Sequence, residues 1–196
     1  MRTNNMMRHL FIIALLSSLL LGCQQSPRKQ YYLLNATPHA DQSVAVTQSV
    51  GLGPIEVADY LQRSQLIVNS DANSLQVSDN AYWGEPLPKG ITRVLAMNLM
   101  NHQPTRAVEL FPWRSDSTPA ISIRIQIHDL QIIDGYAVIN ASWKLMDNLA
   151  KKTVAQHHHI NKRPCESTAR DIAAAYSILL AELGNEINQA LVSKGK

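Results

Sequence analysis

The chain has 196 residues, a length that corresponds to one domain with a short leader. It carries 18 Lys and Arg against 15 Asp and Glu, and the basic residues do not gather on a face interleaved with aromatic residues. Composition therefore gives no support for nucleic-acid binding, and no internal repeat points to a solenoid.

The first 22 residues are predicted to be a signal peptide. Arg2 and Arg8 make the start basic, residues 10–21 form an apolar core, and the small residue Gly22 follows. This core is short, since a membrane-spanning helix needs about 20 apolar residues. Removing residues 1–22 leaves 174 residues with 16 basic and 15 acidic side chains, so the mature chain is expected to be nearly neutral.

Cys23 is predicted to carry a lipid. The stretch Leu20-Leu21-Gly22-Cys23 resembles a bacterial lipobox, which implies a diacylglyceryl group on the Cys23 sulfur, cleavage before Cys23 and acylation of the new amine. The alternative is an ordinary signal peptide with an incidental cysteine. Several acyl chains anchor a protein stably. Gln24 follows the cysteine in place of the Asp that tends to retain enteric lipoproteins at the inner membrane, which favours the outer membrane, facing the periplasm.

Cys165 is then the one remaining cysteine of the mature chain. No intramolecular disulfide is available to it, even in an oxidising compartment. We expect a partly buried thiol without chemistry, an intermolecular bridge being the alternative.

Residues 23–30 are predicted to form a lipidated tether, and residues 31–196 to form the domain. Val44, Val46 and Val50 alternate along a strand over 43–52, which Gly53-Pro54 is expected to break. Further along, the patterns predict a strand at 31–35, a helical turn and strand within 56–68, a turn at 70–73, a strand at 74–78, a helix at 86–101 and a strand at 107–113.

The strongest local signal in the sequence predicts a β-hairpin with its turn at Asp134-Gly135. Asp134-Gly135 lies between two alternating apolar runs. Before the turn, apolar residues occupy odd positions up to Ile127 and even positions from Leu130 onwards. On the returning strand they are odd throughout.

This change of parity predicts a β-bulge. An unbroken register from the two-residue turn would place Ile127 opposite the polar Ser142. One extra residue near His128 and Asp129 places Ile127 opposite Ala141 instead, so the bulge is expected there.

The chain is predicted to end in a strand at 153–161 and a long helix. Thr168 and Asp171 match a capping box. The fold class is therefore α+β, an antiparallel sheet with helices packed on one face and a long C-terminal helix. The helix carries an apolar stripe at helical spacing: Ile172, Ala175, Tyr176, Leu179, Leu183, Ile187, Ala190 and Leu191.

Catalytic and metal signals are weak. His157 and His159 would share one face of a strand and His158 the other, and a third ligand would have to come from His128 or Glu109. A His-rich polar strand is the simpler interpretation, so we expect no metal site and no cofactor. There is no Gly-x-Ser-x-Gly elbow and no phosphate-binding glycine loop.

Several motifs in order resemble a known family. "YYLL" follows the lipobox, "VGLGPIEVADYLQRSQLIV" resembles a strand, V-x-V-P-D-Y-L-x-R and a strand, and "YWGEPLPKGITRVLAMNL" resembles a W-x-x-P-L…L-x-x-N-L helix. Ala58 is a departure from the family motif, which often has proline at this position. The chain is similar to the ABC-type transport auxiliary lipoproteins of the PqiC (YmbA) family over nearly the whole mature length.

The resemblance implies a non-catalytic docking subunit on the outer membrane. Its implied partner is an MCE-domain protein that spans the periplasm and carries lipid between membranes. A homo-oligomer is an open alternative, as are a lipid- or cell-wall-active hydrolase and a stand-alone lipid-binding module with an apolar cavity between sheet and helix. The matching positions Asp59, Tyr60 and Leu61, together with Tyr82 and Trp83, are the candidate partner contacts.

Overall fold

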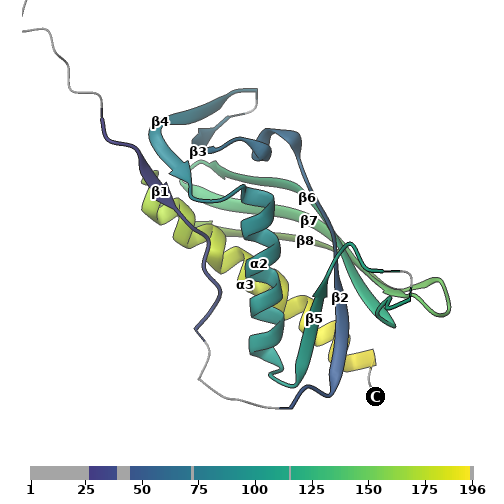
Figure 1. Cartoon of the computed structure of the whole chain (residues 1–196). Coiled ribbons are helices and arrows are strands. Elements are labelled where there is room, and N and C mark those ends of the chain that lie inside the picture. The colour runs from purple at the N-terminus through teal and green to yellow at the C-terminus, as the bar shows by residue number, and fades with distance from the viewer. Residues whose placement is uncertain (1–26, 39–44, 72, 115, 195–196) are drawn as a thin grey trace, which may run out of the picture.

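A computed structural model describes residues 27–38, 45–71, 73–114 and 116–194. The predicted signal peptide and Cys23 lie outside these residues. The described residues form two sheets and two long helices (Figure 1). The smaller sheet has the order β1-β4-β3 and the larger the order β5-β2-β6-β7-β8. The strands are β1 (Gln30–Tyr32), β2 (Gln48–Val57), β3 (Gln65–Ser70), β4 (Leu75–Trp83), β5 (Arg106–Leu110), β6 (Ile121–Ile133), β7 (Tyr136–Asp147) and β8 (Lys152–Pro164).

The predicted bulge is confirmed in the hairpin of β6 and β7. Leu130 pairs with Ile139 and Ile127 with Ala141, and the register shifts between Ile127 and Asp129. The shift keeps the apolar residues of both strands on one buried face despite the change of parity in β6. Asp134 and Gly135 form the turn with positive φ angles of 50° and 76°.

Strand β2 departs from the prediction at both ends. It begins at Gln48, so Val46 lies outside it and is 61% exposed, whereas Val50 is buried. Gly53-Pro54 does not end the strand, because β2 absorbs one extra residue between Leu52 and Ile55, where its register against β6 shifts. Gly53 has a φ of 123°, a conformation that favours glycine, so the break expected there is a bulge.

The α+β class is confirmed, with an arrangement of strands that the sequence did not show. β6, β7 and β8 pair antiparallel, as do β3 and β4. β2 pairs in parallel with both β5 and β6, and β1 in parallel with β4. The larger sheet is therefore mixed.

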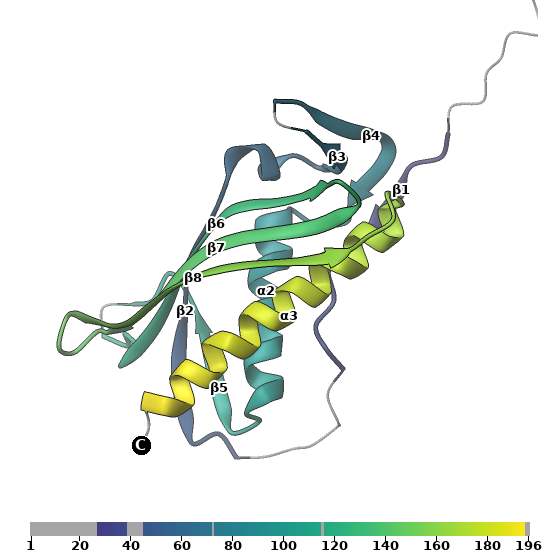
Figure 2. The same cartoon turned by 180° about the vertical axis from the view of Figure 1, so that it is seen from behind.

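Two helices cover one face of the larger sheet, α2 (Leu87–His102) and α3 (Ala169–Lys194), and they cross each other there (Figures 1 and 2). The helix predicted over 86–101 is present one residue later, so Pro86 is its N-cap and Pro88 lies in its first turn. The Thr168 hydroxyl accepts a hydrogen bond from the Asp171 amide at 3.2 Å, which caps α3. No helix of the described residues is long and apolar enough to cross a membrane.

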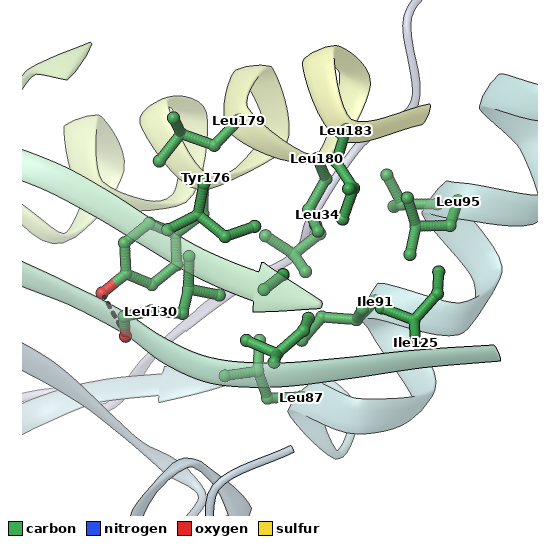
Figure 3. Close-up of a cluster of buried hydrophobic side chains, with 14 of the residues drawn as sticks. Leu34, Leu87, Ile91, Leu95, Ile125, Leu130, Tyr176, Leu179, Leu180 and Leu183 are labelled. Carbon is green, nitrogen blue, oxygen red and sulfur yellow. Dashed lines mark hydrogen bonds between the residues drawn. The ribbon is translucent and has the colours of Figure 1, made fainter. Parts of the chain in front are cut away.

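The core lies between the helices and the sheet. Figure 3 shows leucines of α3 facing residues of α2 and the strands, with Leu34 from the segment after β1 among them. Gly184 lets the helices approach, because a Cβ there would lie 3.3 Å from the Cβ of Asn98. The predicted stripe of α3 is buried from Ile172 to Ile187, and its last two members, Ala190 and Leu191, are partly buried.

Candidate functional site

The segment that leads from the tether into the domain is fixed across both helices. We call residues 33–38 the strap. Leu34 is 1% exposed, and its carbonyl accepts a hydrogen bond from Nη2 of Arg93 at 2.9 Å. The Asn35 amide donates to Oγ of Ser177 on α3 at 3.1 Å. Figure 1 shows this segment running down from β1 across the helices.

Two asparagines of α2 hold the next residue of the strap. Oδ1 of Asn98 accepts from the amide and the hydroxyl of Thr37, at 2.9 and 3.0 Å. Nδ2 of Asn101 donates to the Thr37 carbonyl at 2.6 Å. Asn98 is fully buried. The sequence offered one visible signal for this contact, since Asn98 is a polar residue on the apolar face of a helix.

Three of the five predicted contact residues have structural roles. Leu61 is 2% exposed, and Trp83 is 7% exposed with its ring 6.1 Å from that of Tyr176. The Tyr60 hydroxyl accepts a hydrogen bond from the Leu130 amide at 3.2 Å. These residues therefore build the interior beside η1, the 3₁₀ turn Asp59–Gln62.

Two tyrosines bind the backbone of Leu130, just beyond the bulge. Beside the Tyr60 contact, the Tyr176 hydroxyl donates to the Leu130 carbonyl at 3.1 Å (Figure 3). Both polar backbone groups of the buried Leu130 are thus satisfied from the side. Burial raises the pKa of Tyr60, and the nearby Asp129 adds to the rise while the Leu130 contact opposes it. Burial also raises the pKa of Tyr176.

Ala58 shows why the family motif tolerates a change there. Its φ of −56° is close to the value that proline requires. Its amide donates to the Ile127 carbonyl at 3.1 Å, a contact that proline cannot make.

The remaining members of the predicted set are Asp59, which is exposed, and Tyr82, which is half-buried. Tyr82 lies beside Tyr31, which is 66% exposed, with ring centroids 5.9 Å apart. Nζ of Lys29 lies 5.1 Å from the centre of the Tyr82 ring. We call Lys29, Tyr31 and Tyr82 the aromatic patch. It lies where the described chain begins. Sequence reasoning identified Tyr82 but missed the other two, which reach it through the parallel pairing of β1 with β4.

The histidines divide between two faces of β8, as the alternation predicts. His157 stacks on Trp143 at 4.7 Å, and His159 is buried with Nδ1 2.6 Å from Oε2 of Glu186. His158 lies on the opposite face with Nε2 2.7 Å from Oδ1 of Asn140. Within the described residues, no group of three or more His, Cys, Asp or Glu could hold a metal ion.

One pair on the open sheet face has the distance of a nucleophile and base. Nε2 of His128 lies 2.8 Å from Oγ of Ser142. A catalytic pair also needs a group that orients the imidazole. Across the described residues, no side chain hydrogen-bonds the other ring nitrogen of His128. Cys165 is a buried free thiol whose pKa is raised by burial and by the nearby Asp171 and Glu166, which makes it a weak nucleophile.

The geometry defines a small α+β domain with a chain segment clamped across two helices. The chain belongs to the family of ABC-type transport auxiliary lipoprotein components, which it matches over residues 31–188. The match begins one residue after β1 starts and ends inside α3. No curated protein matches the chain.

Two solved structures share the fold. Protein XCC0632 from Xanthomonas campestris, of the family DUF330, is 17% identical, with 85% of this chain and 96% of that chain covered and a TM-score of 0.68. An uncharacterized protein is also 17% identical, with 84% and 99% covered and a TM-score of 0.69. At this identity the likeness concerns the fold alone.

Proposed function

We propose that the mature protein is a non-catalytic docking subunit, anchored to the outer membrane by lipid on Cys23, that binds an MCE-domain protein carrying lipid across the periplasm. The observation that carries the proposal is the family match over residues 31–188, since a transport auxiliary component requires a transporter to act with. The lipobox at Cys23 and the Gln24 that follows it support the membrane assignment.

The strap fits a tethered subunit. Backbone groups of residues 34, 35 and 37 are hydrogen-bonded to α2 and α3, so a force on the tether reaches both helices. Five residues lie between Cys23 and Lys29, and the six steps from one to the other span at most about 22 Å in a fully extended chain. The aromatic patch is therefore held within a short distance of the lipid anchor, and tethering raises its effective concentration at the membrane.

The aromatic patch is the surface that we assign to the partner. Tyr31 is exposed and Tyr82 is half-buried beneath Lys29, and tyrosines that remain accessible to a partner are frequent at the energetic centre of protein interfaces. Tyr82 belongs to the predicted contact set, and Tyr31 extends it on the neighbouring strand. Asp59 is exposed and remains the polar candidate of that set.

Co-purification tests the docking. The lipidated full chain, isolated from membranes in mild detergent, is expected to retain an MCE-domain protein. Tyr31→Ala combined with Tyr82→Ala should reduce recovery about tenfold or more, because truncating central aromatic contacts commonly costs more than 1.4 kcal/mol.

Tyr136→Ala is a matched control. Tyr136 is 39% exposed and has Nζ of Lys162 4.7 Å from its ring centre, so it repeats the chemistry of the patch elsewhere on the surface. Recovery should be unchanged in this variant. If the wild-type chain retains no MCE-domain protein, the docking proposal fails. If the double variant retains it at the wild-type level, the assignment of the patch fails.

A further inference from the structure

A cavity of about 400 Å³ lies between the sheet and the C-terminal end of α3, with walls from β2, β5, β6, β7 and β8. Its volume falls within the range of small-molecule sites, roughly 300–1,000 Å³. Figure 2 shows the last turns of α3 passing beside β2 and β5. The apolar part of the wall consists of Val50, Ile121, Leu145, Val154 and Leu191.

Arg106 supplies a positive charge to this cavity. It is 5% exposed at the start of the edge strand β5 and lines the cavity. Its guanidinium donates to Oδ1 of Asn188 at 2.7 Å, to the Leu99 carbonyl at 3.3 Å and to Oε1 of Gln103 at 3.5 Å. All three acceptors are neutral.

The charge has no counter-ion in the described part of the chain. No carboxylate there lies within 4.0 Å of its guanidinium, whereas the buried His159 has the carboxylate of Glu186 at 2.6 Å. Buried charges in proteins are normally paired, because an unpaired one has lost its hydration without gaining a partner. Burial accordingly lowers the pKa of Arg106, but an arginine stays protonated.

We infer that this cavity binds a single-chain amphiphile whose anionic head, a carboxylate or a phosphate, pairs with Arg106 and whose hydrocarbon chain lies against Leu145, Val154 and Leu191. A planar guanidinium with free donors suits either oxyanion. The inference goes beyond the proposed function, because a docking subunit needs no ligand of its own.

The polar rim is compatible with this ligand. Gln48 and Ser49 lie at the rim and are exposed, which leaves the head a route to solvent. Asp147 also lines the cavity, but its carboxylate accepts a hydrogen bond from the Ala150 amide at 2.8 Å. Two strands, β2 and β6, separate β5 from β7, so Asp147 and Arg106 stand at opposite sides of the site.

Photolabelling tests the inference on the lipidated full chain in phosphatidylcholine nanodiscs. Three probes carry the same diazirine-bearing chain: a fatty acid, a lysophosphatidic acid and a neutral monoacylglycerol. We expect both anionic probes to label peptides from β7, β8 and the last turn of α3, about tenfold more strongly than the neutral probe, a ratio equivalent to 1.4 kcal/mol. The fatty acid and the phosphate probe then show which head is preferred.

Two variants remove the site in different ways. Arg106→Gln removes the charge, and Leu191→Trp fills the cavity without touching the guanidinium. Both should reduce anionic labelling about tenfold. Arg114→Gln and Ile178→Trp are the controls. Arg114 is an exposed arginine, and Ile178 lies earlier on α3 beside a separate cavity lined by the strap, so labelling should be unchanged.

Three results would overturn the inference: equal labelling by the neutral probe, labelling that maps to other peptides, or labelling that persists in Leu191→Trp. If Arg106→Gln does not fold, labelling of Leu191→Trp and the comparison of anionic with neutral probes still test the inference.

Discussion

Leu130 lies just beyond the bulge of β6, where β2 no longer pairs with that edge of the strand. Tyr60 and Tyr176 take the amide and the carbonyl of this buried residue in place of a neighbouring strand. The two tyrosines come from η1 and α3, which are far apart in the sequence. Leu130 therefore ties three elements together through hydrogen bonds as well as apolar contact.

Removing the Tyr60 hydroxyl should destabilise the fold. Tyr60→Phe leaves the Leu130 amide without its partner, and an unsatisfied buried donor costs about 1–3 kcal/mol. Urea unfolding followed by circular dichroism measures this loss. Tyr136→Phe, at an exposed tyrosine of the hairpin turn, should change the unfolding free energy by less than about 0.5 kcal/mol. Equal stability of both variants would show that the Leu130 contact contributes nothing.

The same tyrosines predict sensitivity to alkali. Burial raises both pKa values above the ordinary 10.0, so the folded state holds these protons more tightly than the unfolded state does. Their contribution to stability is complete below about pH 10 and is lost as the pH rises above it. Urea midpoints should therefore hold up to about pH 10 and fall progressively as the pH is raised beyond it, because the unfolded tyrosines lose their protons first. The fall should be shallower in Tyr60→Phe, and an equal slope would contradict the assignment.

Glu186 links α3 to the sheet through two partners. Oε1 accepts from the Trp143 indole at 2.9 Å, and Oε2 lies 2.6 Å from Nδ1 of the buried His159. Glu186→Ala should cost about 1–3 kcal/mol, because both groups lose their acceptor. Glu182→Ala, one turn earlier, is the matched control. Glu182 has two partners as well, Arg163, which is 47% exposed, and Nδ2 of the half-buried Asn161 at 2.7 Å. Water can replace Glu182 at both, so its loss should cost about 0–1 kcal/mol by the same unfolding measurement. A reversed order would refute this account.

At the scale of elements, periodicity predicted what is local. The spacing of apolar residues within one segment, or within two neighbouring segments, predicted the hairpin, its bulge and both helices. The parity change at Leu130 was enough to place the bulge, because one slipped residue would bury Ser142. The parallel pairing of β2 was not predictable, since its partners β5 and β6 lie far along the chain and parallel pairs leave no turn signature.

The strap was missed for a related reason. It is held through the backbone of Leu34 and Thr37, and a carbonyl or amide carries no mark in the sequence. Sequence reasoning also could not tell which of the candidate contact residues are buried. Tyr60, Leu61 and Trp83 match a motif, but a motif residue that packs the core resembles one that binds a partner until burial is known.

Asn98 offers a test of the strap. Asn98→Ala removes the acceptor for both donors of Thr37 and should release residues 35–38 from α2. We expect faster amide hydrogen exchange confined to the strap, together with a loss of about 1–3 kcal/mol in unfolding free energy. Ser78→Ala, in the β3–β4 hairpin, should leave exchange at the strap unchanged. Unchanged exchange in Asn98→Ala would show that Leu34 and Asn101 hold the strap without it.

At the scale of the whole molecule, the proposed lipid anchor and the folded domain can be altered independently by mutation. The proposed lipid on Cys23 would hold the strap and the aromatic patch near a membrane, and the residue that follows Cys23 is expected to decide which membrane. Gln24→Asp should leave acylation of Cys23 intact, because the lipobox is unaltered, while the protein stays at the inner membrane. Density-gradient fractionation locates the protein, and a clickable fatty acid reports acylation. Cys23→Ser is the control that should lose the label altogether.

Gln24→Asp and Cys23→Ser test separately the membrane assignment and the lipid anchor of the proposed function. If lipidation at the outer membrane is what brings the domain to its partner, Gln24→Asp should lower co-purification of the MCE-domain protein although the domain is unchanged. Tethering in the right membrane supplies effective concentration that a modest interface needs. Retained co-purification from the inner membrane would mean that the partner is reached from either side, so the docking proposal would survive and the outer-membrane assignment would lose its role. Equal labelling of Cys23→Ser would instead remove the lipid anchor itself.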